Sequence, residues 1–402
     1  MKISQAAKNA FRLGALCTIS YLAVYVVRNM LGAVTPQLLE AGIYTEAEVG
    51  ALSSLYFICY AIGQLINGII GDRIKARYMM SFGLFLGGLT SLLFSFFTAT
   101  PALALTVYGA SGFFLAMIYG PMTKVVAENT EPLHATRCSL GYTVATLVGS
   151  PIAGLLAAFL AWQNVFTLGS SVLMVIAVAC FFYFIVLEKR GIVRYGQYKR
   201  QSTKLSDAVR VLLKRRILTF TVIAIVTGIV RNSVVFWLPT YISQALHFNP
   251  QESASIYTVA TMVIATSSFI SVFLYERLGH SMDKTLIITF SLSVISFLLV
   301  YFVSNPLLNI ILMVLAILGS NAATTMLWTH YCPSLYETGM VSSATGFLDC
   351  MSYAGAAIAN LVFANAVTKI GWGNLILIWF GLMVIGLAVS LPGIRYIKRR
   401  EQ

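Results

Sequence analysis

Long runs of apolar residues alternate with short polar segments along almost the whole chain of 402 residues. Each run is about twenty residues or longer, the length that an α-helix needs to cross a hydrocarbon core of roughly 30 Å. We therefore expect an all-α, polytopic membrane protein with twelve transmembrane helices. The predicted spans are residues 13–35, 48–70, 79–97, 102–127, 139–160, 164–187, 217–240, 253–275, 285–303, 306–330, 340–367 and 374–394.

The longest polar segment, residues 188–216, divides these spans six and six. It predicts an N-terminal six-helix bundle at 1–187, a basic linker at 188–216 and a C-terminal six-helix bundle at 217–402. Residues 204–214 of the linker have the pattern of a basic amphipathic helix on the membrane surface, and a solvated linker is the alternative. The first run is too long, and too unlike a cleavage region, to be a signal peptide.

Composition agrees with a membrane protein, because 58% of the residues are hydrophobic and only 10% are charged. The net charge of +13 comes mainly from polar segments on one side of the predicted spans, including both chain ends and the linker. The positive-inside rule therefore predicts that both termini are cytoplasmic. The basicity follows the topology and favours anionic lipid headgroups, so we expect a lipid bilayer and no nucleic acid as partner. We expect a monomer in a bacterial inner membrane.

The pattern Arg-Asn-x6-Pro occurs once in each half, from Arg28 to Pro36 and from Arg231 to Pro239. Matching halves indicate a duplicated six-helix unit, so we predict two pseudo-symmetric bundles. Transporters built from such repeats place their substrate site between the repeats and expose it alternately to each side of the membrane.

A second repeat lies in the polar turns that follow spans 2 and 8, where an acid-Arg pair begins each turn. With Gly68, the first turn reads GxxxDRxxxR and resembles the signature loop of the major facilitator superfamily. In that superfamily the acid and the arginines latch neighbouring helices in one conformational state. The resemblance implies coupling or structural roles for Asp72, Arg73 and Arg77 in the first turn and for Glu276 and Arg277 in the second.

Two arginines and one acid lie well inside predicted spans, namely Arg28, Arg231 and Asp349. Burying an ionised side chain in a bilayer is costly, and such residues usually have a partner or a function. Each arginine precedes its proline by eight residues, which places it roughly 12 Å inside the membrane, near the middle of the core. One interpretation pairs the arginines with carboxylates, although Asp349 could serve only one of them. The other interpretation is a substrate anion that bridges both guanidinium groups through parallel hydrogen bonds.

Polar and aromatic residues surround Arg28 in the predicted spans. Tyr21 and Tyr25 share its helix face, Tyr60 and Gln64 lie one turn apart in span 2, and Tyr119 lies in span 4. Phenolic hydroxyls can bond the remaining oxygens of an anion or the hydroxyls of a sugar, and packing is the alternative role for each tyrosine.

The segments YLAVYVVRN, PQLLEAGIYTEAEVG and ETGMVSSATGFLDCMSYAGA resemble the organophosphate:phosphate antiporter family. This family includes bacterial glycerol-3-phosphate and hexose-phosphate transporters. The resemblance implies that two arginines hold phosphate, and that a phosphorylated metabolite is exchanged for inorganic phosphate as the two halves rock. The implied substrate-binding residues are Arg28, Arg231, Tyr21, Tyr25, Tyr60 and Tyr119, to which we add Gln64, Asn29, Asn232 and Trp237 from the same motifs.

Three positions depart from those bacterial carriers. Asn29 and Gln64 stand where lysines are expected, and Thr146 stands where the glycerol-phosphate carrier has histidine. Two fixed positive charges suit a dianion, and a carboxylate or a less charged phosphoester is the alternative substrate.

Other functions of the same fold stay open. A proton-coupled organic-anion symporter would use Asp349 as its titratable group, and a non-transporting sugar-phosphate sensor is also known in this family. An exporter of drugs or lipids would have an apolar cavity without paired arginines. The sequence holds no catalytic constellation, and its six cysteines lack ligand spacing. We therefore expect no enzyme activity, no metal and no cofactor.

Overall fold

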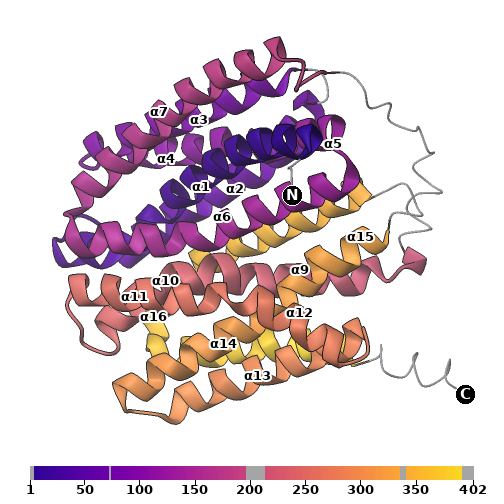
Figure 1. Ribbon diagram of the computed structural model, residues 1–402. Helices are drawn as coiled ribbons and strands as arrows, with labels where there is room; N and C mark the ends of the chain where they lie inside the picture. The colour runs from indigo at the N-terminus through magenta and orange to yellow at the C-terminus, as the bar shows by residue number, and fades with distance from the viewer. Residues whose placement is uncertain (1–3, 72–73, 196–212, 336–340, 392–402) are drawn as a thin grey trace, which may run out of the picture. The chain divides into compact units, whose positions relative to one another are not determined.

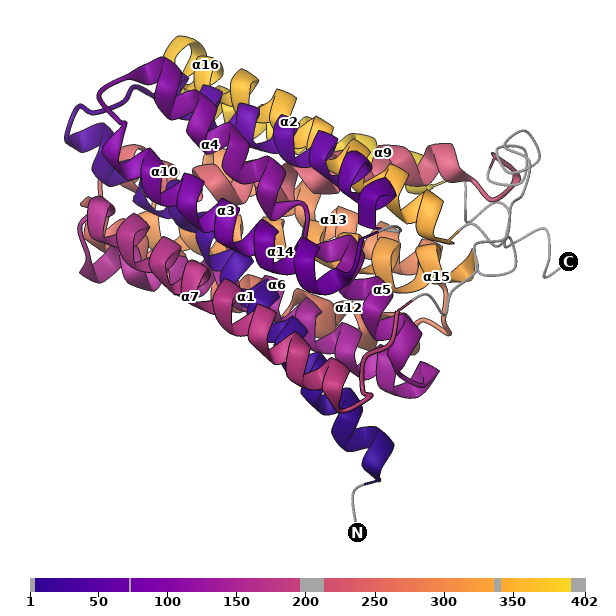
Figure 2. The same ribbon diagram turned by 90° about the horizontal axis from the view of Figure 1, so that it is seen from above.

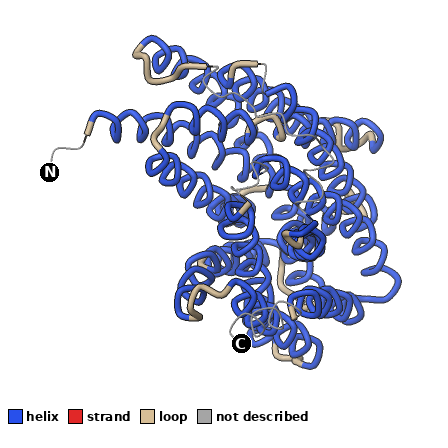
Figure 3. The backbone as a smooth tube through the Cα atoms, turned by 90° about the vertical axis from the view of Figure 1, so that its right-hand side faces the viewer, coloured by secondary structure: helices blue, strands red, loops and turns tan. Residues whose placement is uncertain are grey.

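A computed structural model describes residues 4–71, 74–195, 213–335 and 341–391 of the chain. Within these ranges all regular secondary structure is helical (Figure 3). Asp72, Arg73 and most of the predicted amphipathic helix at 204–214 lie outside the described residues.

The helices of the first half follow the predicted spans closely. α1 begins at Gln5, eight residues before the predicted span, because Ser4 caps it by accepting a hydrogen bond from the Ala7 amide. Predicted span 4 is divided into α4 and α5. The elements are α1 (Gln5–Glu40), α2 (Glu46–Gly71), α3 (Ala76–Phe96), α4 (Pro101–Leu115), α5 (Tyr119–Asn129), α6 (Pro132–Phe159) and α7 (Trp162–Lys189).

Two short π-helices, η1 and η2, interrupt the helices of the second half, and no sequence pattern indicated them. The elements are α9 (Ile217–Ile229), η1 (Val230–Val234), α10 (Val235–Gln244), α11 (Pro250–Ala265), α12 (Ser267–Arg277), α13 (Met282–Phe302), α14 (Pro306–Met326), η2 (Leu327–Tyr331), α15 (Cys332–Ser334) and α16 (Val341–Ser390).

Within the described ranges, ten helices are long and apolar enough to cross a membrane. The two remaining predicted spans are also helical. The span at 139–160 falls in α6, whose apolar part, Val144–Phe159, is shorter. The last two spans share the label α16 and are separated by a break at Gly371, where the backbone takes φ 75° and ψ 170°. Glycine adopts this left-handed region without a steric penalty. The helices therefore agree with a twelve-span protein.

The chain divides into two compact units. The first contains Met1–Tyr44, Leu55–Arg200 and Pro250–Thr258, and the second contains Thr45–Ser54, Gln201–Asn249 and Val259–Gln402. The start of α2 thus belongs to the second unit, and the start of α11 belongs to the first.

Close helix packing positions the residues of the first unit. α1 packs against α6 and α7, and α3 packs against α4 and α7 (Figures 1 and 2). Gly149 of α6 lies directly against Tyr25 of α1, and Gly112 of α4 lies against the backbone of Tyr56 in α2. A side chain at either glycine would collide with its neighbour, so both allow the close approach that is common between membrane helices.

In the second unit, α16 packs against α9 and α13, and α14 packs against α12 and α13. Gly228 of α9 is pressed against Ser352 of α16. This contact lies one turn before Arg231 and fixes the helix that carries it.

Candidate anion-binding site

Arg28 lies on α1 inside the first unit, and only 7% of its surface is exposed. Its guanidinium carbon is 5.1 Å from the ring centre of Tyr25, 5.2 Å from that of Phe57 and 5.1 Å from that of Tyr60. These distances fall within the range of cation–π attraction. The three rings, which we call the aromatic box, come from α1 and α2 and surround the guanidinium group.

Tyrosine rings extend the aromatic box along α1. The ring centre of Tyr21 is 5.0 Å from that of Tyr25, 5.6 Å from that of Tyr119 and 6.4 Å from that of Tyr142. The structure therefore brings together Tyr21, Tyr25 and Tyr119, as the sequence predicts. It adds Tyr142 of α6, which the sequence analysis missed.

A second group of rings lies beyond Tyr60. The ring centre of Tyr60 is 6.1 Å from that of Tyr56. The ring centre of Tyr56 is in turn 5.2 Å from that of Tyr108 in α4. Tyr56 lies one turn before Tyr60 on α2, so this spacing could have identified it. Gln64 lies one turn beyond Tyr60 and is half-buried.

Arg231 lies in η1, where the Val235 amide donates to the Val230 carbonyl five residues back. Its Nη2 atom is 3.9 Å from Oδ1 of Asp349 in α16, and its guanidinium carbon is 5.9 Å from the ring centre of Tyr353. The structure thus places Asp349 beside Arg231, as one interpretation of the sequence expects. At 3.9 Å these two atoms are an ion pair beyond hydrogen-bond distance. The arginine side chain is 29% exposed and the aspartate side chain is 21% exposed, so we expect the pair to stabilise the fold by at most about 1 kcal/mol.

The asparagines that follow the two arginines both bond to their own helices. The Asn29 side-chain amide donates to the Tyr25 carbonyl at 2.6 Å, and that of Asn232 donates to the Gly228 carbonyl at 2.9 Å. Trp237 of α10 is fully buried. Its indole nitrogen has no hydrogen-bond partner among the residues that the structure describes.

Arg77, from the signature loop, pairs with an acid that the sequence analysis did not select. Its Nη1 atom is 2.7 Å from Oε2 of Glu188 at the end of α7, and its Nη2 donates to the Tyr78 hydroxyl at 2.7 Å. The Tyr195 hydroxyl donates to Oε1 of the same glutamate at 2.8 Å. Burial, and then this hydrogen bond, raise the pKa of Tyr195, so the tyrosine stays a donor at neutral pH.

The second acid-Arg pair has a different environment. Glu276 and Arg277 are exposed at the end of α12. The Arg277 guanidinium carbon lies 4.8 Å from the ring centre of Phe273.

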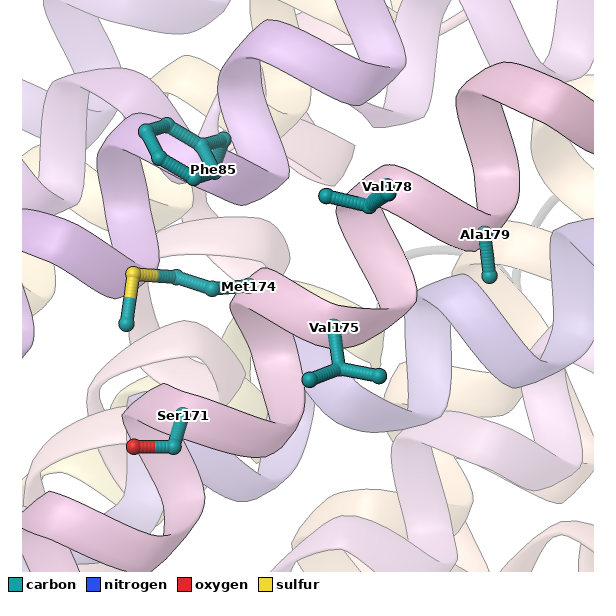
Figure 4. A pocket seen from close by; sticks show the side chains of 6 residues that line it. All are labelled: Phe85, Ser171, Met174, Val175, Val178 and Ala179. Atoms are coloured by element: carbon teal, nitrogen blue, oxygen red, sulfur yellow. The ribbon is translucent and has the colours of Figure 1, made fainter.

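An open groove lies between α3 and α7 on the surface of the first unit (Figure 4). One side chain is polar, that of Ser171, and the other five are apolar: Phe85, Met174, Val175, Val178 and Ala179. A groove without charge fits lipid chains better than an anion. Over the described ranges, no group of three or more His, Cys, Asp or Glu side chains could hold a metal ion.

Two helical units with ten membrane-length helices in the described ranges define a multi-pass integral membrane protein. The family model described as Major Facilitator Superfamily matches residues 17–360, so the chain belongs to this superfamily of transporters.

Relatives within the superfamily confirm the resemblance to organophosphate:phosphate antiporters. The chain is 23% identical to the glycerol-3-phosphate transporter of Bacillus subtilis over 388 residues, which cover 89% of this chain and 86% of the relative. It is 24% identical to the phosphoglycerate transporter protein of Salmonella typhimurium over 436 aligned positions, covering 99% and 93%. The crystal structure of a D-xylose-proton symporter has the same fold, with a TM-score of 0.76 at 11% identity, over 95% of this chain and 97% of that one.

Proposed function

We propose that this transporter exchanges an organophosphate of the sugar-phosphate or glycerol-phosphate type for inorganic phosphate by alternating access. Arg28 and Arg231 bind the phosphate. The observation that carries this proposal is the Arg28 guanidinium group, buried in a membrane helix within an aromatic box. The Arg-Asn-x6-Pro repeat supplies the second arginine from the other half of the chain.

The chemistry of the aromatic box supports an anion as substrate. Ring faces attract the flat faces of a guanidinium group. The N–H groups lie at the edges of that group and stay available to a ligand. Those N–H groups can form two parallel hydrogen bonds with a phosphate. The box therefore orients Arg28 for an anion that approaches in the plane of its guanidinium group.

The surrounding tyrosines support a substrate whose organic part carries hydroxyl groups. Tyr21, Tyr25, Tyr119 and Tyr142 gather phenol groups from three helices. Phenolic hydroxyls both donate and accept hydrogen bonds. The names of two relatives, a glycerol-3-phosphate transporter and a phosphoglycerate transporter, also favour a small phosphorylated compound.

Asp349 has a distinct role in this proposal. It is a partner of Arg231 when no substrate is bound, and a phosphate then competes with its carboxylate for the guanidinium group. On the grounds given by the sequence, the proposal also includes a monomer in a bacterial inner membrane, with both termini in the cytoplasm.

A proton-coupled organic-anion symporter is the second candidate. The observation that favours it is the same carboxylate, half-buried beside Arg231, because a titratable group within the substrate pathway is what proton coupling needs.

Exchange of labelled phosphate into proteoliposomes loaded with inorganic phosphate tests the proposal. It is measured at several pH values without a proton gradient, with Arg28→Ala and Arg231→Ala as variants. We expect exchange by the wild-type protein and none by either variant. Uptake of anions only with a proton gradient would support the symporter, and no transport in either assay would favour a sensor.

A further inference from the structure

Each of the two arginines, Arg28 and Arg231, is followed by an asparagine whose side chain donates to the carbonyl four residues back. We propose that Asn29 and Asn232 are positioning residues that set the direction of the arginine before them. Asn232 does so by holding the helix around Arg231 in its π form. This inference rests on the proposed role of Arg231 in phosphate binding.

The hydrogen bond of Asn232 coincides with a change in the helix. A side-chain donor that enters the backbone ladder competes with the amide that would bond the same carbonyl, and this distorts a helix locally. The turn that follows the Gly228 carbonyl is wound as a π-helix from Val230 to Val234. Such segments are rare and occur mostly as single turns, frequently at functional sites. Arg231 lies within this one.

The residue that accepts the hydrogen bond explains why a π turn forms after α9 and not in α1. In α9 it is Gly228, a weak helix former that is pressed against Ser352 of α16. Ser233 anchors the other end of the π segment by donating to the Ala356 carbonyl of α16 at 3.0 Å.

In α1 the accepting residue is Tyr25, which is packed against Gly149, and the helix stays α-helical. Asn29 there fixes the backbone of a residue whose ring belongs to the aromatic box. The same Arg-Asn pair thus occurs in two helix geometries.

The π turn decides which way Arg231 points. Successive residues of an α-helix differ by about 100° around its axis, and a π turn holds one more residue than an α turn. Conversion of η1 to an α-helix would therefore turn α10 by roughly that angle relative to α9, and Arg231, the second residue of η1, by part of that angle. The Arg231 side chain would then shift away from its present neighbours, Asp349 and Tyr353 of α16.

Two substitutions separate the hydrogen bond from packing. Asn232→Leu keeps a similar volume without a donor, and Asn232→Thr restores a hydroxyl that can bond a carbonyl four residues back. Asn365→Leu is the matched control, because Asn365 donates to the Leu361 carbonyl at 2.9 Å on an exposed face of α16.

The affinity for inorganic phosphate is measured from exchange in proteoliposomes with equal amounts of protein. We expect Asn232→Leu to weaken it roughly three- to tenfold, the loss of about one net hydrogen bond. Asn232→Thr recovers most of the loss, and the control matches the wild type. Unchanged affinity of Asn232→Leu would overturn the inference, as would failure of threonine to restore it.

A second measurement does not depend on phosphate. Two proteins are compared, the single variant Arg231→Cys and the double variant Arg231→Cys with Asn232→Leu. The rate at which a hydrophilic thiol reagent modifies the cysteine at position 231 is measured by mass spectrometry of the peptide. We expect the reaction rate to change at least several-fold, because the side chain shifts relative to its neighbours in α16. Equal rates would overturn the positioning role, whereas absence of phosphate exchange by the wild-type protein would overturn only the proposed function.

Discussion

Replacing Arg28 by lysine keeps the positive charge and removes the guanidinium plane. The lysine ammonium group lacks the planar fork that gives two parallel hydrogen bonds to a phosphate, so one of these two charge-assisted hydrogen bonds is lost. Such a bond contributes about 2 kcal/mol. The ring faces at 5.1, 5.2 and 5.1 Å lose the flat group that they surround. We therefore expect phosphate affinity to fall about 30-fold.

The assay is the phosphate concentration that gives half-maximal exchange in proteoliposomes. Arg12→Lys is the control, because Arg12 lies on the same helix, four turns before the aromatic box. We expect this variant to match the wild type. A half-maximal concentration for Arg28→Lys within about threefold of the wild-type value, at equal protein content, would refute the argument that the planar fork binds phosphate.

Three further predictions follow from other contacts. Asp349→Asn removes the carboxylate 3.9 Å from the second arginine and should strengthen phosphate binding by up to about fivefold, measured by the same exchange assay. Weaker binding or loss of exchange in this variant would contradict competition between the carboxylate and phosphate. Phe57→Leu removes one ring of the aromatic box and should weaken phosphate binding about two- to fivefold. Tyr60→Phe keeps its ring and should therefore keep its cation–π attraction to Arg28. Equal phosphate affinity of Phe57→Leu and the wild type would argue against a contribution from cation–π attraction. Glu188→Gln should lower the melting temperature in detergent by about 1–3 °C, compared with the exposed control Glu40→Gln; equal melting temperatures would show that the pair with the signature-loop arginine contributes nothing.

The membrane spans could be predicted from the sequence because their length and apolar character are local properties. The exceptions were the breaks that divide spans 4 and 8, and the π turns. The break at Gly371 falls between the predicted spans 340–367 and 374–394, as the sequence predicts. At η1 the sequence Arg-Asn is the same as in α1, so the winding depends on the accepting residue and on contacts with α16.

The charged residues of the candidate site stood out because they interrupt apolar runs. Phe57 did not stand out, because an aromatic residue in an apolar helix does not interrupt the apolar pattern. Tyr108 and Tyr142 come from α4 and α6, and they lie near the site because glycines on those helices allow close packing with α2 and α1. Such contacts between helices could not be predicted from one sequence.

The aromatic box also affects the entropy of binding. A free arginine side chain has about 2 kcal/mol of rotamer entropy, part of which is lost when a ligand immobilises it. Three rings already restrict Arg28 before any anion arrives, so most of that loss occurs when the protein folds. Arg231, which is 29% exposed, has more freedom to lose. Anion binding should therefore order the second arginine more than the first.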